Sequence, residues 1–436
     1  ADYIYRDIGG AAVETDWYYF AANISADGLS GRIYFNGANP ATLINGTPTI
    51  TADETPLYFG RDNTGTYPFN GYIDEVRIEN TYRGADWIRL CYQNQRANQT
   101  LVSSWYNTLW NYRIKISVNE SLVIPTGLSN FPVYVDLANL PPAFFTNVSD
   151  INGGDILVTA SDGITRLPRE VVSFNNGGTG QLFFRAPALS NYENTHFYIY
   201  FNSSSMQTNE TAVWSNGYAG VWHMEDNSFP DSTGNYNVLS LGGLQAPGAM
   251  GYGLLFDGSG MDVAAVGDPA PILSFGTEYQ VLAWFTPSNG AAPGNPMIVG
   301  SDGGPNGIEL MINPQDDIIQ VFNQPYRGDY AIADMPVDNI AAGTPGLYGV
   351  LVANTSCLIH FNGSGVSTET IDVPLNTQLN YVYFGYSPYT AGYPAGTIDE
   401  VRIMNVNQGV NWLTTEENNL RLQTSFIIPA AAIEPQ

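Results

Sequence analysis

Apolar and polar residues alternate in short runs along this chain, which is the pattern of half-buried β-strands. Residues 112–118 read YRIKISV, in which isoleucine and valine fall on one face and arginine, lysine and serine on the other. Residues 196–202, HFYIYFN, alternate in the same way. Turn signals such as NGG, SDG and NNGG separate runs of about 8 to 12 residues. The spacing predicts a β-sandwich over residues 102–205.

A second pattern is an internal repeat, which emerges when the chain is aligned with itself. GYIDEVRI at 71–78 matches GTIDEVRI at 396–403, at an offset of 325 residues. Small slips extend the match to residues 12–95 and 342–420, and both copies are predicted to be strand-like. The second copy follows a stretch, 206–340, that has no counterpart ahead of the first copy.

The repeat also predicts local structure. GRIYFNG at 31–37 alternates and then ends in Asn-Gly, a strong signal for a tight turn. In IDEVRI, strict alternation would place isoleucine, glutamate and arginine on one face and aspartate, valine and isoleucine on the other. The alignment sets Tyr18 against Tyr348. A helix is predicted after each motif, where Trp87 and Trp412 precede aliphatic residues at helical spacing and are favoured as core anchors.

These segments resemble known families. WHMED, DSTGN, GLLFDG, AWF, HFNG, YFG and GTIDEVRI, in this order over 206–425, resemble a complete laminin-G-like, concanavalin A-like jelly roll of secreted prokaryotic proteins. WNYRIKI, FPVYVDL, GGDILVT, DGITRLPREV, FRAPAL and FYIYFN, within 102–205, resemble the domain-of-unknown-function family numbered 2341, which commonly precedes such a domain. The resemblance implies an all-β chain of tandem β-sandwiches. The residues FIIPAAAIEPQ, at 426–436, predict an extended, Pro-containing tail that forms an edge strand or a linker.

Residues 1–98 resemble only the C-terminal half of a laminin-G-like jelly roll. Strands from both halves of such a sequence interleave in both sheets, so half a sequence would leave sheet edges unpaired and core faces wet. Three alternatives stay open. Upstream residues of a longer precursor complete the sandwich, strands from another molecule complete it as in donor-strand complementation, or the region forms a smaller self-sufficient sheet.

Composition narrows the functional classes. Asp and Glu number 41 against 15 Lys and Arg, with Lys115 the single lysine, so the net charge is −26. This charge disfavours a nucleic-acid partner. It suits either the binding of divalent cations and cationic groups or an acidic surface that keeps the protein in solution.

No stretch is apolar enough to span a membrane. The start of the sequence lacks a signal-peptide pattern, so either a signal was removed or the chain begins inside a larger precursor. Cys91 and Cys357 form either a bridge or two buried thiols.

Asn-x-Ser/Thr sequons are frequent and predict an exported glycoprotein if they are occupied. The acceptor residues are Asn23, Asn45, Asn98, Asn119, Asn147, Asn202, Asn209, Asn354 and Asn362. Chance sequons also arise easily in a chain rich in asparagine and threonine.

The sequence predicts no catalytic residues. It lacks a nucleophile elbow, HExxH, a P-loop and a dinucleotide fingerprint. Jelly-roll glycosidases of the resembled fold carry an E-x-D-x-E run on one strand, and no such run occurs here. The histidines are too widely spaced for a zinc site. For His223, in WHMED, packing with a hydrogen bond is favoured.

Calcium is the ligand that the sequence favours most, because hard oxygen donors stand in turn-forming segments. DSTGN supplies Asp231 and Asn235 around a glycine that permits a sharp bend. The resemblance implies that the acid of IDEV contributes, which is Asp399 here, with Asp74 as its counterpart in the first copy. The alternative is an Asx-turn at DSTGN and an Asp399 carboxylate that accepts backbone N–H groups.

Together these features favour a non-enzymatic, extracellular cell-surface protein. The preferred interpretation is a structural subunit of a filament, sheath or surface coat, with copies of itself or other surface proteins as partners. The alternative is a carbohydrate-binding or adhesive module of a larger secreted protein. Tyrosine and tryptophan on a sandwich rim stack well on glycans, but tyrosines occur along the whole chain and serve protein contacts equally.

Overall fold

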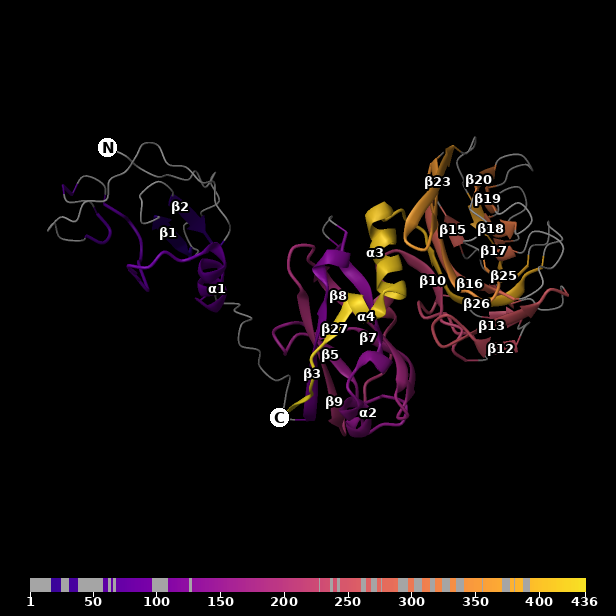
Figure 1. Ribbon diagram of the computed structural model, residues 1–436, viewed down its shortest axis with the longest axis horizontal. Helices are drawn as coiled ribbons and strands as arrows, with labels where there is room; N and C mark the ends of the chain where they lie inside the picture. The colour runs from indigo at the N-terminus through magenta and orange to yellow at the C-terminus, as the bar shows by residue number, and fades with distance from the viewer. Residues whose placement is uncertain are drawn as a thin grey trace. The chain divides into compact units, whose positions relative to one another are not determined.

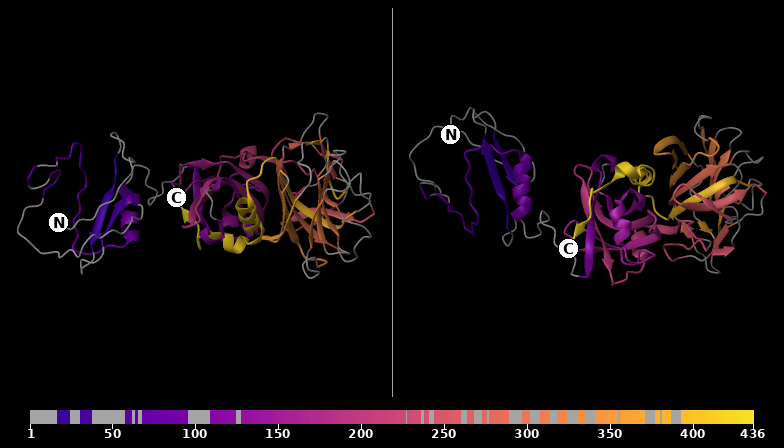
Figure 2. Two further views of the ribbon diagram at one scale, coloured as in Figure 1. Left: turned by 90° about the horizontal axis from the view of Figure 1, so that it is seen from above. Right: turned by 60° about the horizontal axis from the view of Figure 1, so that its bottom comes forward.

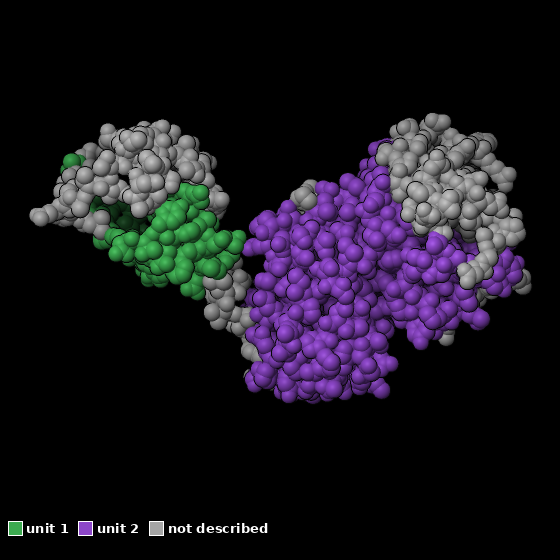
Figure 3. Space-filling model, viewed as in Figure 1, with its two compact units in different colours: residues 1–103 green, residues 104–436 purple. Residues whose placement is uncertain are grey.

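The structure is a computed structural model of two compact units, residues 1–103 and 104–436 (Figure 3). It describes residues 17–24, 31–37, 58–61, 64–65, 68–95, 109–124, 128–226, 228–235, 238–240, 244–259, 264–267, 273–275, 277–288, 297–301, 308–313, 318–323, 330–334, 341–354, 356–370, 377–379, 381–386 and 393–436. Most described elements are strands in antiparallel sheets, so the prediction of an all-β fold is confirmed. None of the described helices is long and apolar enough to cross a bilayer.

Unit 1 contains a hairpin and a helix among its described residues. Strands β1 (Phe20–Ile24) and β2 (Gly31–Phe35) pair antiparallel, and helix α1 (Ala85–Gln95) follows later in the chain. Tyr34 of β2 and Ile88 of α1 are buried. One side chain of the hairpin and one of the helix are therefore shielded from solvent in this part of unit 1.

The first sandwich of unit 2 consists of two sheets (Figures 1 and 2). One has the strand order β27-β3-β9-β5-β6, with β28 also paired to β3, and the other has the order β4-β8-β7. The strands are β3 (Trp110–Val118), β4 (Leu128–Asp136), β5 (Leu157–Thr159), β6 (Arg166–Leu167), β7 (Arg169–Asn175), β8 (Thr179–Leu189), β9 (Thr195–Ser203), β27 (Ile427–Pro429) and β28 (Glu434–Pro435). Short helices are η1 (Glu120–Leu122), η2 (Leu137–Asn139), α2 (Pro142–Asn147) and η3 (Thr211–Trp214).

The second sandwich of unit 2 has two larger sheets (Figure 1). One has the order β12-β13-β26-β16-β21-β22-β23, with β10 paired to β26, and the other has the order β11-β14-β25-β17-β18-β19-β20; β15 and β24 pair separately. The strands of the first sheet are β10 (Tyr218–Trp222), β12 (Leu244–Pro247), β13 (Tyr252–Asp257), β16 (Glu278–Pro287), β21 (Gly346–Ala353), β22 (Ser356–Phe361), β23 (Ser364–Thr370) and β26 (Ala395–Met404).

The remaining strands of the second sandwich complete its other sheet and the small β15–β24 pair. They are β11 (Val238–Ser240), β14 (Ala264–Gly267), β15 (Leu273–Phe275), β17 (Met297–Ser301), β18 (Ile308–Asn313), β19 (Ile318–Asn323), β20 (Tyr330–Asp334), β24 (Thr377–Leu379) and β25 (Tyr381–Phe384).

Strand β16 is buried on both faces. Val281, Ala283 and Phe285 belong to the core between the two sheets of the second sandwich. Leu282 and Trp284 belong to the apolar cluster that continues into the first sandwich. Burial on both sides explains why LAWF reads as a continuous apolar run instead of an alternation. The two sandwiches of unit 2 therefore pack against each other through the sheet that holds β16.

The C-terminal segment returns to the first sandwich. Helices α3 (Val410–Arg421) and α4 (Gln423–Phe426) lead into β27 and β28, and both of these short strands pair with β3 (Figure 1). The segment expected as an extended tail, residues 426–436, thus adds the outermost strands of this sheet. The first sandwich is assembled from two parts of the chain, with the whole second sandwich inserted between them.

Helices α3 and α4 cover the open edge of strand β4 with side-chain amides, from Asn419 of α3 and Gln423 of α4. Asn419 Oδ1 accepts from the Tyr134 N–H at 3.1 Å, and its Nδ2 donates to the Pro132 carbonyl at 3.1 Å. One turn later, Gln423 Oε1 accepts from the Asp136 N–H at 2.9 Å, and its Nε2 donates to the Tyr134 carbonyl at 3.2 Å. The two amides take the place of a neighbouring strand and leave these edge groups hydrogen-bonded.

Strict alternation in the second IDEVRI is wrong. Ile398, Val401 and Ile403 all lie in the core of the second sandwich. Glu400 has a φ of +47°, and the register of β26 against β16 shifts at this point. The extra residue of this β-bulge brings Val401 onto the same face as Ile398.

We expect Asn419→Leu to lower the free energy of unfolding of unit 2 by about 2–4 kcal/mol, because it leaves a buried N–H and a buried carbonyl of β4 without partners. Urea unfolding of the full chain, followed by tryptophan fluorescence, measures the change. Thr414→Val is the matched control on the same helix: its hydroxyl bonds only the Val410 carbonyl, so we expect a change below about 0.5 kcal/mol. Equal stability of Asn419→Leu and the unmodified chain would show that the amide does not support the edge.

Candidate functional site

The first copy of the repeated motif is exposed in unit 1. Ile73, Val76 and Ile78 are 49, 50 and 70% exposed, whereas their counterparts in β26 are at most 1% exposed. The structure assigns residues 72–79 to no strand, and no ladder partner for them is found among the described residues of unit 1. The prediction of a strand is therefore wrong for this segment, although it shares the six residues IDEVRI with β26.

The exposed copy nevertheless keeps the backbone of the buried one. Glu75 has a φ of +50°, close to the +47° of Glu400. The Arg77 Nε donates to Glu75 Oε1 at 2.8 Å, as the Arg402 Nε donates to Glu400 Oε1 at 2.8 Å. Positive φ is uncommon for a residue other than glycine. Glu75 therefore has the positive φ of the bulge residue of β26, at a place where the described residues supply no opposing strand.

The hairpins of the two copies are also alike. The Asn36 N–H donates to the Tyr19 carbonyl at 2.8 Å, and the Tyr19 N–H donates back to Asn36 Oδ1 at 3.0 Å. The same pair of bonds joins Asn362 and Leu347, at 2.9 and 3.0 Å. The tight turn predicted from Asn-Gly is confirmed. These bonds make Phe20, and not Tyr18, the counterpart of Tyr348.

In unit 2 the environment of the motif is complete. Strand β26 pairs with β16 along one edge and with β13 and β10 along the other. Trp412, after the motif, is buried against Phe131 of the first sandwich, with ring centroids 4.9 Å apart. Its counterpart Trp87 is 47% exposed, so the expected core role holds for Trp412 and is wrong for Trp87. The two environments differ because neighbouring strands and a neighbouring sandwich cover the second copy.

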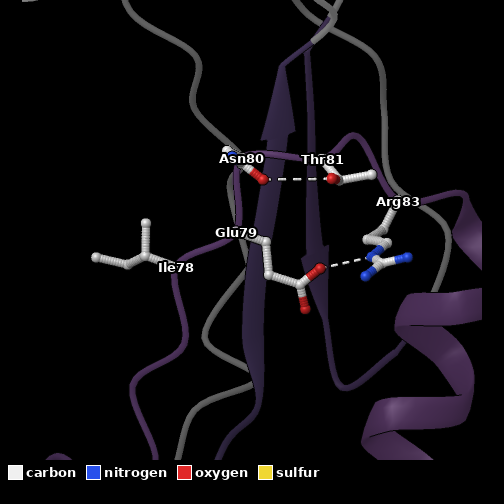
Figure 4. Close-up of a pocket in the computed structure, with 5 residues that line it drawn as sticks. All are labelled: Ile78, Glu79, Asn80, Thr81 and Arg83. Atoms are coloured by element: carbon white, nitrogen blue, oxygen red, sulfur yellow. Dashed lines mark hydrogen bonds and ion pairs between the residues drawn. The ribbon is translucent and has the colours of Figure 1, made fainter.

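A shallow pocket lies at the end of the exposed segment (Figure 4). Its lining is Ile78, Glu79, Asn80, Thr81 and Arg83. Glu79 Oε2 and Arg83 Nε are 2.5 Å apart, and the Arg83 guanidinium lies 4.2 Å from the Trp87 ring centroid. The charged groups of the pocket thus pair with each other, while the Ile78 side chain points away from them (Figure 4). The pocket continues the exposed surface of residues 72–79 and shows no separate chemistry.

Comparison with known families agrees with this geometry in unit 1. Residues 2–89 match the Laminin_G_3 model, described as the concanavalin A-like lectin/glucanases superfamily. This region is laminin-G-like in sequence. A search of curated proteins found no match to the chain.

Solved structures give a weak likeness to part of the chain. Domain 4 of AbnA, a GH43 extracellular arabinanase from Geobacillus stearothermophilus in complex with arabinotriose, is 18% identical with a TM-score of 0.37, covering 46% of this chain and 97% of that chain. The receptor binding domain of botulinum neurotoxin D is 14% identical with a TM-score of 0.39, covering 46% and 52%. The binding domain of Paraclostridial Mosquitocidal Protein 1 is 12% identical with a TM-score of 0.39, covering 47% and 52%.

The residues proposed for calcium are engaged in protein hydrogen bonds. Asp231 Oδ1 accepts from the N–H groups of Val221 and Thr233, at 2.9 and 3.0 Å. Its Oδ2 accepts from the Thr233 hydroxyl at 2.6 Å and from the Asn235 N–H at 2.9 Å. The Asn235 Nδ2 donates to the Ala219 carbonyl at 3.1 Å. DSTGN is thus a turn held by Asp231, the alternative that the sequence left open.

Asp399 is buried in β26, and its Oδ2 accepts from the Met250 N–H at 2.8 Å. A Cβ at Gly248 would lie 2.5 Å from that oxygen, so the backbone closes over the carboxylate. Burial, and then the charge of Glu400, raise the pKa of Asp399 well above its usual value. Asp74 is exposed and accepts from the Glu75 N–H at 2.8 Å. Among the described residues no three His, Cys, Asp or Glu side chains gather at a metal-binding distance, and calcium stays a prediction.

Most described sequon asparagines donate through Nδ2, the atom that a glycan would modify. The acceptors are main-chain carbonyls at 2.6 to 3.0 Å for Asn23, Asn119, Asn147, Asn202 and Asn209. Asn354 is exposed at the turn between β21 and β22, and Asn362 accepts from the Leu347 N–H. Asn45 and Asn98 lie outside the described residues. Glycosylation stays a prediction, with Asn354 the described residue that best presents its side chain to solvent.

A buried ionic cluster lies where the two sandwiches of unit 2 meet. The Arg402 Nη1 donates to Glu416 Oε1 at 2.8 Å, in addition to its bond with Glu400. The Tyr218 hydroxyl donates to Glu416 Oε1 at 2.8 Å, and the Gln280 Nε2 donates to Glu416 Oε2 at 3.0 Å. These side chains come from three strands and one helix, and all are buried. The cluster is a structural network in which two carboxylates share one buried guanidinium.

His223 links this network to the first sandwich. Its Nδ1 lies 2.6 Å from Glu400 Oε2, and its Nε2 lies 3.5 Å from Glu170 Oε2. The imidazole stacks on Phe183 with ring centroids 4.8 Å apart. Burial alone would lower the pKa of His223, but the two carboxylates outweigh it and raise the pKa to about 10. The packing and hydrogen-bonding role favoured from the sequence is the one that the structure shows.

The two cysteines do not form a disulfide with each other. Cys357 is buried in the core of the second sandwich, and Cys91 is partly buried on α1. Of the two alternatives that the sequence allowed, the structure contains the unbridged one.

We expect His223→Gln to flatten the loss of stability of unit 2 at alkaline pH. The folded pKa of about 10 exceeds the ordinary value of 6.5, so His223 stabilises the fold fully below pH 6.5 and this contribution disappears as the pH rises through 10. The size is on the order of a few kcal/mol. Urea unfolding of the full chain between pH 6 and 10 measures the slope.

Glu225 provides the control, because burial raises its pKa to about 7 from 4.5. Its contribution is present below pH 4.5 and disappears as the pH rises through 7, so Glu225→Gln should change the slope below pH 7 and leave the alkaline slope in place. An unchanged alkaline slope in His223→Gln would contradict the charged state of the buried imidazole.

Proposed function

We propose that this chain is an extracellular, non-catalytic protein that acts by binding and assembly, as a structural or adhesive component of a cell surface. Unit 2 is its stable framework, and unit 1 presents the surface that engages a partner. The partners are copies of the chain or other surface proteins.

The observation that carries this proposal is that the IDEVRI motif is buried in unit 2 and exposed in unit 1. Burying Ile398, Val401 and Ile403 is the ordinary state of this strand, yet the same side chains of unit 1 are half exposed or more. Phe59 is 60% exposed, whereas its counterpart Phe384 is 1% exposed. Contiguous exposed apolar residues of this kind mark interaction surfaces. A partner that binds unit 1 would bury the apolar side chains of the first copy, as neighbouring strands bury those of the second copy in unit 2.

Two further features support a binding role. The laminin-G-like match at residues 2–89 falls on the unit that carries the exposed motif. The buried carboxylates Glu400 and Glu416 of unit 2 are bound to Arg402, and Glu170 accepts from the Trp214 indole at 2.7 Å, so these acids are occupied in holding the two sandwiches together. The net charge of −26 suits a solvated surface outside the cell.

Self-association of the purified full chain tests the assembly proposal. We expect oligomers or polymers by size-exclusion chromatography with light scattering and by negative-stain imaging. Val76→Asp places a charge in the exposed apolar motif and should reduce the association constant at least about tenfold. Leu90→Asp is the matched control, because Leu90 is an equally exposed apolar residue on α1, and its variant should assemble normally. A chain that stays monomeric at every concentration would overturn the assembly role.

Carbohydrate binding is the second candidate, favoured by the family description of residues 2–89, which includes lectins. A glycan array probed with the full chain, with and without a calcium chelator, tests it. We expect a reproducible glycan ligand if the adhesive interpretation holds, and loss of that ligand on chelation if calcium takes part. Binding that persists in Asp231→Asn and in chelator would remove calcium from the proposal, and an array without any ligand would remove the lectin role.

A further inference from the structure

We infer that residues 72–79 of unit 1 are the acceptor for a β-strand that is supplied from outside unit 2 and has the sequence pattern of β16. The inference rests on the proposed binding role of unit 1 and names the chemistry of its partner. The acceptor takes backbone hydrogen bonds along its edge and apolar side chains over its core face, the mode of β-strand addition.

The second copy of the motif supplies the pairing map. Strand β16 pairs with β26 from Gln280 to Pro287, across the bulge at Glu400. Shifted to the first copy by the repeat offset, Trp284 lies opposite Asp74 and Leu282 lies opposite Arg77. The positive φ of the bulge residue is already present at Glu75, at +50°. The acceptor is therefore preshaped for one register of one kind of strand.

The side chains of the donor strand follow from the same map. Val281, Ala283 and Phe285 enter the core between the sheets of the second sandwich, beside the isoleucine and valine of β26. A donor with apolar residues at these alternating positions would cover Ile73 and Val76 in the same manner. Because successive residues of a strand point to opposite faces, the alternation also fixes which face of the donor meets unit 1.

The donor is not strand β16 of unit 2 itself. Strand β16 of unit 2 pairs with β21 along one edge and β26 along the other, over most of its length. Its release would expose Leu282 and Trp284, which are buried in the cluster shared by the two sandwiches. Donation from this position would therefore dismantle the framework of unit 2.

A synthetic peptide tests the acceptor directly. The probe is TEYQVLAWFTPS, the sequence of residues 277–288, with a lysine tag for solubility and a fluorophore, added to the full chain. We expect saturable binding by fluorescence anisotropy and new protection of residues 72–79 from hydrogen exchange. The same peptide with proline at the Leu282 position should bind at least about tenfold more weakly, because proline is poorly tolerated inside a paired strand.

Variants of unit 1 locate the binding. Val76→Asp and Ile78→Asp should each weaken the peptide at least about tenfold, whereas Leu90→Asp should leave it unchanged. Both acceptor positions are exposed, and unchanged exchange in β1, β2 and α1 verifies that the variants fold. No peptide binding, equal binding to Val76→Asp, or protection confined to residues outside 72–79 would overturn the inference.

The peptide experiment tests the strand acceptor and the self-association experiment tests assembly, so either proposal can be overturned without the other. If the full chain assembles while the peptide neither binds nor competes, assembly stands and the strand acceptor is overturned. If the peptide binds the acceptor and the chain remains monomeric, the acceptor stands, and its donor strand comes from upstream residues of a longer chain or from a different polypeptide.

Discussion

The pairing of strand edges decides what each copy of IDEVRI becomes. In β26 the backbone is bonded to β16 on one edge and to β13 and β10 on the other, and its faces are covered by a core and by a second sandwich. In unit 1 the identical residues are exposed. Propensity for the extended state is the same in both copies, so the neighbours and not the local sequence produce the strand.

The same constraint explains how unit 2 closes its own edges. β4 is an edge strand, and the amides of Asn419 and Gln423 bond its open backbone groups as a neighbouring strand would. The cost of burying Arg402 is offset because two carboxylates accept its hydrogen bonds, with His223 joining the network across the sandwich boundary. Removal of one partner would leave a buried charge uncompensated, so the two sandwiches are held in one fixed arrangement.

Alternation and turn signals were sufficient to predict the all-β class, the first sandwich and the Asn-Gly hairpins, because these depend on residues close in sequence. The bulge at Glu400 was not predictable, since it depends on the opposing strand. The ionic cluster joins Glu400 to His223, 177 residues away. One local signal was available. Glu400 and Arg402 stand two residues apart in a strand that also contains isoleucine, valine and methionine, and such charges are most stable when they pair. The sequence instead drew attention to Asp399, the neighbouring acid.

The positive φ preserved at Glu75 bears on the energetics of binding by unit 1. A residue other than glycine at positive φ costs on the order of 1–3 kcal/mol and persists where the surroundings impose it. In β26 the opposing strand imposes it at Glu400. At Glu75 the described contacts are the local ones with Asp74 and Arg77, and exposed ion pairs stabilise weakly. A strand that adds to this edge therefore finds the positive φ of the bulge residue already present, and less of its binding free energy is spent on ordering the acceptor. Preorganisation of this kind favours one register over the shifted alternatives, so the selectivity of unit 1 for its partner would lie in the backbone as much as in the apolar side chains.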